Sequence, residues 1–402
     1  MRRAGASLLV SVVLLGLLVG PAHARAAWKL RIDRLVAGKT IGVAVREQDR
    51  YLYKHQSRRR RVPASNQKLL LSMALFDRLE PERRIETSAA TAGLVGPVIE
   101  DDLWLLGRGD PTVSGGGHLA RELPFEPTRL GTLAREIRAA GVTRIDGRVI
   151  GSTGYFARDW WAHGWEAHFP SEWIPLPTAL SFEGNQIEGR HIADPEIRAA
   201  RSLTQKLRDL GVSVTGRAAA GVAPSQLTTV ASVSSVPLQT MVRYMNRRSS
   251  NFFSEVFGKR VGLERSGFPG TIAKGAAAIE AWAKRYGVAL TAYDSSGLSY
   301  ENRVSPNGLV RLLDVAEDQT WGVVLRNGLP GPNEGTLEDR LNGVRVRAKT
   351  GSLTNISTLS GYVWLRERQT WAEFSIMSRG MSKTYASAIE DDIVRILTRA
   401  AR

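Results

Sequence analysis

Cysteine is absent from the 402-residue chain, which excludes disulfide bonds, thiol nucleophiles, thiolate metal sites and a lipid-bearing cysteine. Histidine is also scarce, with 6 residues. His163 and His168, with Glu166 between them, match neither the His-Glu-x-x-His nor the His-x-x-Glu-His spacing of zinc sites. We therefore expect structural histidines, no metal and no cofactor, and a fold held together by packing.

Long hydrophobic runs are limited to the N-terminus. The apolar stretch from Leu8 to Val19 follows Met-Arg-Arg and precedes an Ala-His-Ala cleavage pattern, as in a signal peptide. Its length of about 12 residues is short of the roughly 20 that span a bilayer, although an uncleaved anchor is the alternative. We predict removal of residues 1–24, no remaining transmembrane segment, and export to the periplasm or an equivalent extracytoplasmic space, as a soluble or peripherally membrane-associated protein.

Acidic residues are outnumbered by basic ones, 39 to 55, so that the net charge is +16. Such a field favours anionic partners. Nucleic acid is not expected, because the chain has an export signal and no recognition module. Outside a bacterial cytoplasm the anionic partners would be cell-wall polymers or lipid headgroups, and the basic run at 58–61 is expected to be a solvated surface segment.

Apolar periodicity and turn residues predict alternating helices and strands. A mostly buried helix is expected over residues 63–79. Three segments share one pattern, a helix closed by a glycine and then a short β-rich run: residues 133–145, 203–214 and 279–290. The C-terminal part predicts three strands and a helix, which would make a sheet edge backed by a terminal helix: residues 344–350, 359–365, 370–377 and 385–398.

Residues 155–177 have no clear period and carry four tryptophans, Trp160, Trp161, Trp165 and Trp173. We predict a long ordered loop and a candidate wall of a substrate groove. Aromatic faces suit sugar rings, so contact with glycan is one alternative, but large aromatic side chains more often fill a core.

Ser65 and Lys68 lie three residues apart where the helix over 63–79 begins, so one turn brings the amine over the hydroxyl. A serine hydroxyl is a weak nucleophile until a neighbour accepts its proton, and a desolvated lysine can do this because its pKa falls. The helix N-terminus also favours a developing oxyanion. Since Ser-x-x-Lys is common by chance, this interpretation depends on further motifs.

Two further motifs follow along the chain. Ser249 and Asn251 supply a second hydroxyl for proton transfer and an amide that can orient lysine or substrate. Lys349, Thr350 and Gly351 lie on a predicted strand, where the glycine permits close approach of a substrate backbone and the other two can hold a carboxylate. The order and local context of all three motifs indicate a serine acyl-transfer enzyme.

With these motifs the chain resembles the serine penicillin-binding proteins and β-lactamases, and more narrowly the low-molecular-mass D-Ala-D-Ala carboxypeptidases that carry a large insert. The gap between the first two motifs is nearly twice the gap that follows, as the insert implies. The chain departs from the family pattern at Ser250, where aspartate is common, and at Leu-Glu-Pro-Glu in 79–82, where Leu-Gly is usual. The narrower resemblance rests on four strings, at residues 63–68, 103–112, 294–299 and 335–340.

The resemblance implies that Ser65 attacks the carbonyl of the penultimate D-Ala of a peptidoglycan peptide. Lys68 would accept the serine proton and Ser249 would return a proton to the leaving amine. β-Lactam antibiotics would acylate Ser65 as covalent inhibitors, and water would complete the cycle. The implied substrate-binding residues are Asn251, Lys349, Thr350, Gly351 and Ser352, with the N–H groups of Ser65 and Ser352 as the oxyanion hole.

The fold that the resemblance implies is α/β, an antiparallel sheet flanked by helices as in penicillin-binding proteins and β-lactamases. We expect residues 28–95 and 230–402 to form this domain and residues 96–229 to form an inserted smaller domain or domains.

Several alternatives stay open at this point. The balance between carboxypeptidase and endopeptidase action is undetermined. A β-lactamase is disfavoured because no Glu-x-x-Leu-Asn string is present to aid deacylation, and a non-catalytic cell-wall binding protein would not need intact motifs. Tyr244 belongs to a tyrosine version of the second motif, which fits the surroundings less well. Asp110 and Asp294 are further candidate site residues, although an aspartate in a turn commonly caps its own backbone. The sequence Arg108-Gly109-Asp110 predicts a structural turn.

Overall fold

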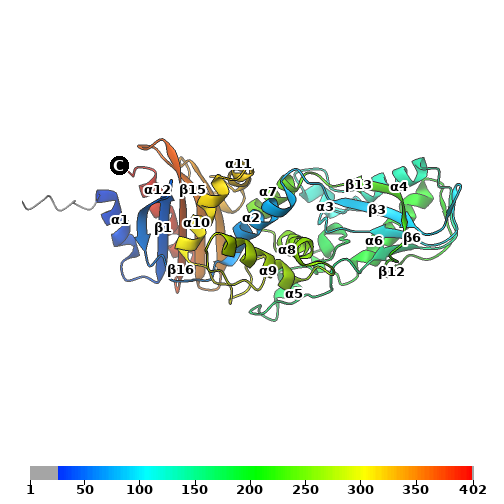
Figure 1. Cartoon of the computed structure of the whole chain (residues 1–402), viewed down its shortest axis with the longest axis horizontal. Helices are drawn as coiled ribbons and strands as arrows, with labels where there is room; N and C mark the ends of the chain where they lie inside the picture. Colours follow the sequence, from blue (N-terminus) through cyan, green and yellow to red (C-terminus); the bar gives the residue numbers. More distant parts are fainter. Residues whose placement is uncertain (1–25, 401–402) are drawn as a thin grey trace, which may run out of the picture.

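The computed structural model describes residues 26–400, so the predicted signal peptide at 1–24 lies outside the described residues. The chain forms an elongated molecule with a sheet at each end and a group of helices between them (Figure 1). None of the helices in residues 26–400 combines the length and the apolar character needed to cross a bilayer.

The sheet near the chain termini is antiparallel and has the strand order β14-β15-β16-β1-β2. Alternate residues of its central strands face opposite cores, since strand side chains have a period of two. Val363 and Ile376 pack with the terminal helices, whereas Tyr362 and Met377 pack with the middle helices. The elements are α1 (Ala27–Val36), β1 (Ile41–Glu47), β2 (Arg50–His55), β14 (Val346–Leu353), β15 (Ile356–Leu365), β16 (Thr370–Arg379) and α12 (Lys383–Leu397).

The predicted C-terminal strands and helix are therefore confirmed, and so is the flanked antiparallel sheet. The terminal helices α1 and α12 contact each other on one face of the sheet, and α10 covers the other face at β1 and β16 (Figure 1). Because both faces are covered, every residue of β1 is buried. The helix predicted over 63–79 is present as a short 3₁₀ turn followed by α2, whose residues 67–76 are all buried.

The middle helices form one hydrophobic core around α2. They are η1 (Ala64–Asn66), α2 (Gln67–Leu79), α7 (Leu238–Arg248), α8 (Asn251–Ser266), α9 (Ile272–Arg285), α10 (Pro306–Glu317) and α11 (Gly322–Gly328). Ser65 lies at the end of this core that meets the sheet, because η1 contacts both β14 and β15.

The far end of the molecule holds a second five-stranded sheet, of order β12-β8-β6-β3-β13, and a smaller one, of order β11-β7-β5-β4, around a separate core with α4 and α6 (Figure 1). The elements are β3 (Glu86–Thr91), β4 (Leu94–Val95), β5 (Val98–Ile99), β6 (Leu103–Leu106), α4 (Leu130–Ala139), β7 (Arg144–Ile145), β8 (Val149–Ser152), α6 (Pro195–Asp209), β11 (Ser213–Val214), β12 (Ala219–Gly221) and β13 (Thr228–Ser234). Short elements between them include α3 (His118–Glu122), α5 (Phe169–Glu172), β9 (Gln186–Ile187) and β10 (Arg190–His191).

Two of the three predicted helix-glycine-strand units are confirmed, and their strands β7 and β11 pair side by side in parallel. Gly141 and Gly211 have φ of 94° and 78°, the left-handed conformation that closes a helix with least strain for glycine. The third unit is wrong in part. Gly287 follows α9, but residues 288–290 form no strand in the described chain, because Val288 packs into the helical core instead of pairing.

The second sheet contains strands that lie outside the predicted insert at 96–229. In chain order it begins with β3 and ends with β13, which pair antiparallel, so β3 lies before the predicted insert and most of β13 lies after it. In addition, part of the segment 155–177 packs with Ala64 of η1 and Leu353 of β14 instead of with the second sheet. The division of the chain into domains otherwise stays a prediction.

Candidate active site

Lys68 is the centre of the candidate site. Its side chain is fully buried, and its Nζ donates to Ser65 Oγ at 3.2 Å, to Asn251 Oδ1 at 2.9 Å and to the carbonyl of Ser296 at 2.5 Å. Burial lowers the pKa of Lys68 to about 7, against the opposing effect of the carboxylates of Asp294 and Glu255. An amine that loses its proton near neutral pH can accept one from the adjacent hydroxyl.

The junction between α7 and α8 forms one side of the candidate site. Ser249 occupies this junction with φ of 55°, a left-handed conformation that is uncommon outside glycine. Ser250 then caps α8, because its Oγ accepts from the N–H of Phe253 at 3.3 Å. Aspartate and serine are both favoured helix caps, so the departure from the family pattern at this position conserves a capping side chain.

Lys349 joins this junction to the sheet. The side chain is fully buried, and its Nζ donates to Ser249 Oγ at 2.9 Å and to the carbonyl of Thr350 at 2.8 Å. Burial lowers the pKa of Lys349 well below the ordinary value, and the cations of Lys68 and Lys383 lower it further. Two buried lysines thus reach one site from α2 and from β14.

Strand β14 passes the site at close range. A Cβ on Gly351 would lie 2.2 Å from Thr358 Oγ1 and 3.0 Å from the backbone nitrogen of Ser65, so only glycine lets the strand approach this closely. Thr350 Oγ1 is 2.7 Å from Thr336 Oγ1, and Ser352, two residues further along the strand, is exposed. β14 is an edge strand, and the N–H of Ala348 on its outer side donates to the carbonyl of Pro330 at 3.0 Å, so an extended ligand can pair only with the part of this edge beyond Ala348.

Helix α8 contributes a row of three polar side chains, Asn251, Glu255 and Lys259, at a spacing of four that places them on one face. The three sequence motifs do not include Glu255 or Lys259. The spacing of four residues from Asn251 to each in turn was the sequence feature that could have indicated them. Both are fully buried. Their partners are two separate loops that border the site.

Glu255 holds the loop that contains Asp294. Its Oε1 accepts from the N–H groups of Ser295 at 2.8 Å and Ser296 at 2.6 Å. Burial raises the pKa of Glu255 to about 8, and the nearby carboxylate of Asp294 adds to the effect. The carbonyl of Ser296 is a partner of Lys68, so Glu255 fixes the position of a group that contacts the amine.

Asp294 lies beneath the site, where it organises its own loop. Its carboxylate accepts from the N–H of Ser299 at 2.7 Å, the Nδ2 of Asn302 at 2.7 Å and the indole N–H of Trp165 at 2.8 Å. It influences the pKa of Lys68 only through its charge. These hydrogen bonds therefore indicate a structural role for Asp294.

Asp110 is not joined to this cluster by any hydrogen bond or ion pair of the described residues. Its buried carboxylate accepts from the N–H of Thr112 at 2.8 Å and from the hydroxyls of Thr112 and Thr128, as expected for an aspartate that closes a turn. Tyr244 contacts the rings of Phe125 and Phe253, so it packs as an aromatic side chain beside the site.

Lys259 anchors the tryptophan-rich loop. Its Nζ donates to the carbonyls of Ala157 at 2.9 Å, Asp159 at 3.0 Å and Pro177 at 2.9 Å, and it pairs with the Asp159 carboxylate at 2.7 Å. These carbonyls come from both ends of the segment 155–177. One buried ammonium group therefore closes the base of the loop.

The loop reaches the candidate site through two of its tryptophans. The carbonyl of Trp173 accepts from Asn251 Nδ2 at 3.1 Å, and its ring, 41% exposed, borders a hollow of about 310 Å³ together with Ser352 and Lys383. Trp165 is buried and bonded to Asp294. The predicted long loop is thus present, with the single turn of α5 inside it, and it forms one wall beside the candidate site.

Comparison with known proteins places the whole arrangement in one family. The family model described as "D-Ala-D-Ala carboxypeptidase 3 (S13) family" matches residues 29–190 and 183–400. A D-alanyl-D-alanine carboxypeptidase of Actinomadura sp. (strain R39) is 26% identical, over 90% of this chain and 81% of that protein. A carboxypeptidase of Mycobacterium tuberculosis is 30% identical, over 75% of this chain and 67% of that protein.

Solved structures share the fold. Penicillin-binding protein 4 of Haemophilus influenzae matches with a TM-score of 0.78 at 18% identity, over 92% of this chain and 99% of that one. A predatory peptidoglycan endopeptidase of Bdellovibrio bacteriovorus matches with a TM-score of 0.57 at 14% identity, over 89% and 92% of the two chains. The resemblance predicted from the motifs is therefore confirmed, and the chain belongs to the D-Ala-D-Ala carboxypeptidase 3 (S13) family.

Proposed function

We propose that the protein hydrolyses D-Ala-D-Ala peptides of peptidoglycan through an acyl intermediate on Ser65. The observation that carries the proposal is the buried amine of Lys68, which lies 3.2 Å from Ser65 Oγ and has a pKa near 7. Its other two partners, Asn251 and Ser296, hold it in place, so the amine needs no rearrangement to accept the serine proton.

The remaining groups supply the other steps of the reaction. Attack by Ser65 Oγ on the penultimate D-Ala carbonyl creates an oxyanion, which the N–H groups of Ser65 and Ser352 stabilise. Collapse of this intermediate breaks the peptide bond, and the leaving amine takes a proton from Ser249. Lys349 replenishes that proton through its hydrogen bond with Ser249. Water then hydrolyses the acyl-serine ester: its oxygen joins the acyl carbon, Ser65 Oγ regains its proton from Lys68 as the ester bond breaks, and the proton released by the water restores Lys349.

Substrate binding follows the edge of β14. Lys349 and Thr350 hold the terminal carboxylate, because the anion favours the protonated form of the amine and the hydroxyl of Thr350 lies next to Thr336. Gly351 lets the substrate backbone lie close to the strand, and Asn251 binds the peptide amide. Endopeptidase cleavage of a cross-bridge is the same reaction with a longer leaving group.

We further propose that the protein works outside the cytoplasm after loss of residues 1–24, and that β-lactams acylate Ser65. Penicillin-binding protein 4 of Haemophilus influenzae, which shares the fold, is known in complex with a β-lactam. The net charge of +16 supports anionic cell-wall polymers as further partners.

Mass spectrometry of the purified mature protein after incubation with benzylpenicillin tests the reaction. We expect a stable adduct on Ser65. It should be absent from the Ser65→Ala variant and present in the Ser225→Ala variant, because Ser225 is an exposed residue between β12 and β13, far along the chain from Ser65. Release of D-Ala from a D-Ala-D-Ala peptide should show the same pattern. Intact drug without an adduct would favour a binding protein, and hydrolysed drug without an adduct would favour a β-lactamase.

A further inference from the structure

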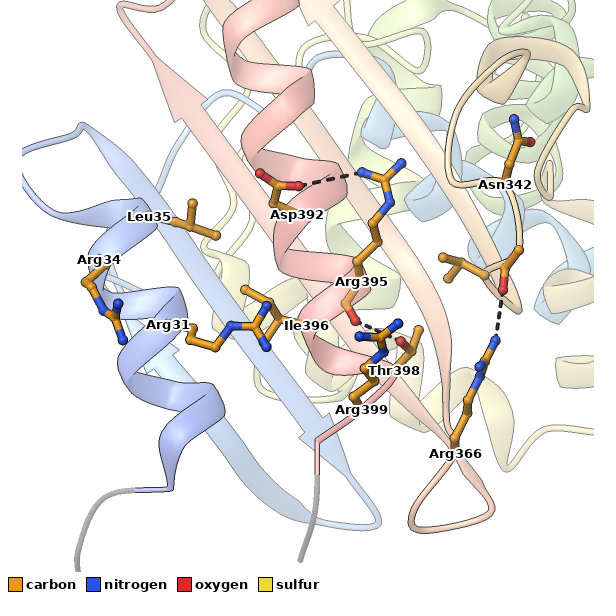
Figure 2. Close-up of a pocket in the computed structure, with 12 residues that line it drawn as sticks. Arg31, Arg34, Leu35, Asn342, Arg366, Asp392, Arg395, Ile396, Thr398 and Arg399 are labelled. Atoms are coloured by element: carbon orange, nitrogen blue, oxygen red, sulfur yellow. Dashed lines mark hydrogen bonds and ion pairs between the residues drawn. The ribbon is translucent and has the colours of Figure 1, made fainter.

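We infer that a hollow lined by arginines, at the end of the molecule opposite the second sheet, binds phosphate groups. It has a volume of about 540 Å³ and lies between α1, α12 and the turn that joins β15 to β16 (Figure 2). The inference relies on the proposed location outside the cytoplasm for its biological ligand. It does not depend on the proposed hydrolysis.

The charge of the hollow is strongly one-sided. Of its 12 lining residues five are arginine and one, Asp392, is acidic, whereas the whole chain has 55 basic and 39 acidic residues. The arginines come from α1, the β15–β16 turn, α12 and the residues after α12, so the concentration of charge is produced by the fold: Arg31, Arg34, Arg366, Arg395 and Arg399.

Most of this charge is not neutralised by acidic side chains of residues 26–400. Asp392 lies 3.6 Å from Arg395, and both side chains are about half exposed, so this ion pair is weak. Among the described residues, Arg31, Arg34 and Arg399 have no acidic partner within ion-pair distance. Five guanidinium groups that share a hollow with a single carboxylate repel one another, and a bound anion would reduce that repulsion.

Helix dipoles explain only part of the cluster. A cation in the last turn of a helix is stabilised by the dipole, which accounts for Arg34 in α1 and Arg395 in α12. It does not account for Arg31, in the middle of α1, or for Arg366, in the turn between strands. Their presence around the same hollow is what a binding site requires.

The walls of the hollow are held in place before any ligand binds. The N–H of Arg366 donates to the carbonyl of Thr398 at 3.0 Å, which ties the strand turn to the end of α12. The guanidinium of Arg366 donates to the carbonyl of Gly343 at 2.9 Å (Figure 2). Guanidinium groups bind phosphate oxygens in a bidentate manner, and the volume exceeds that of a single phosphate, so a phosphodiester headgroup or a phosphate-bearing polymer fits this chemistry.

The lipid headgroup is the source that the structure favours. Helix α1 is the first described element after the predicted signal segment, and Leu30 on this helix is 45% exposed beside the arginines. Apolar and basic side chains together are typical of a surface that rests on an anionic bilayer. Soluble phosphate polymers share the chemistry and are distinguished by experiment.

The test compares two double charge reversals of equal size at opposite ends of the molecule. Arg31→Glu with Arg399→Glu alters the hollow, and Arg135→Glu with Arg138→Glu alters exposed arginines of α4 (Figure 1). The probes are vesicles of phosphatidylcholine with phosphatidylglycerol, vesicles of phosphatidylcholine alone, and soluble glycerol phosphate. Melting curves and D-Ala release from a soluble peptide verify that both variants are folded and have unchanged activity.

We expect the mature protein to sediment with phosphatidylglycerol vesicles and not with neutral ones, and high salt to weaken the binding. The hollow variant should bind at least about tenfold more weakly, and the α4 variant within about twofold of the parent. Binding of glycerol phosphate that is lost in the hollow variant, without vesicle binding, would assign the site to soluble phosphates. Equal losses in both variants, or no binding to any phosphate probe, would overturn the inference. Inactive protein that still binds vesicles would refute the proposed hydrolysis alone.

Discussion

The cation of Lys68 lowers the pKa of Lys349 more than any other charge around it. The two amines lie on different elements, α2 and β14, and each contacts one of the two candidate hydroxyls, Ser65 and Ser249. A neutral Lys68 therefore favours a protonated Lys349. Such an arrangement suits a site in which one amine accepts a proton while the other donates one and holds a carboxylate.

The pH dependence of acylation should reflect Lys68. Because the neutral amine is required, the rate constant for acylation by benzylpenicillin should rise with pH, with a midpoint near the pKa of about 7. Stopped-flow measurements across this range would check the rise, and a flat profile through neutral pH would contradict the assignment of Lys68 as base.

A second variant tests the electrostatic cause. The carboxylate of Glu255 raises the pKa of Lys68, but with a pKa of about 8 Glu255 is largely protonated where Lys68 titrates, so Glu255→Gln should move the rising limb only slightly, to lower pH. Glutamine retains an oxygen for the N–H groups of Ser295 and Ser296, which limits the structural change. A limb that moves to higher pH would show that the carboxylate does not act through its charge.

Lys259→Met should release the tryptophan-rich loop. The variant leaves three carbonyls and Asp159 without their shared donor, at a cost of about 3 kcal/mol in the free energy of unfolding. It should also slow acylation and expose residues 155–177 to limited proteolysis, because Trp173 contacts Asn251.

Lys274→Met is the matched control for this change. Lys274 also donates to three carbonyls, those of Gly267, Phe268 and Pro269, but they belong to one exposed turn. We expect a loss below about 1 kcal/mol and unchanged acylation. Equal effects of the two methionine variants would argue against an anchoring role for Lys259.

Gly351→Ala should separate β14 from Ser65. A Cβ there would overlap Thr358 Oγ1 and crowd the nitrogen of Ser65, so the oxyanion site would be displaced. Acylation should slow by about 100-fold, since small displacements of reacting groups have effects of this size. Gly221→Ala, which adds a Cβ with no neighbour closer than 3.7 Å, should acylate normally.

Ser250→Ala should destabilise the protein by about 1 kcal/mol, because α8 loses its N-cap. Ser250→Asp should restore the cap and bring the family residue into this position. Thermal melting of both variants would measure the difference. A loss of stability in the aspartate variant equal to that in the alanine variant would show that capping is not the role of this side chain.

The sequence was most informative where the determining interactions are local. Ser65 and Lys68 are one turn apart, Gly141 and Gly211 end helices through their own backbone angles, and the C-terminal strands follow each other directly. These features depend on near neighbours in the chain, so spacing and residue type were sufficient to predict them.

Features that depend on distant contacts were not predictable in the same way. Lys259 looks like an ordinary helical lysine until the fold brings the carbonyls of Ala157 and Pro177 to it. Likewise, Asp294 stays a candidate site residue beyond the motifs, but its hydrogen bonds, including the one from Trp165, indicate that it supports the loop next to Lys68. Val288 packs into the helical core instead of joining a strand, and no local sequence pattern predicts this.

The pairing of β3 with β13 has a consequence for how this molecule was assembled. The chain leaves the helical body at Ile85 and returns at Ser235, and these two residues are hydrogen-bonded, with the N–H of Ser235 2.9 Å from the carbonyl of Ile85. A segment whose ends are already neighbours can be gained without disturbing its host, because a short turn would join the same two points. Its tryptophan-rich loop, however, returns to the host and contacts Asn251, so exchanging the segment between relatives would also exchange one side of the candidate site.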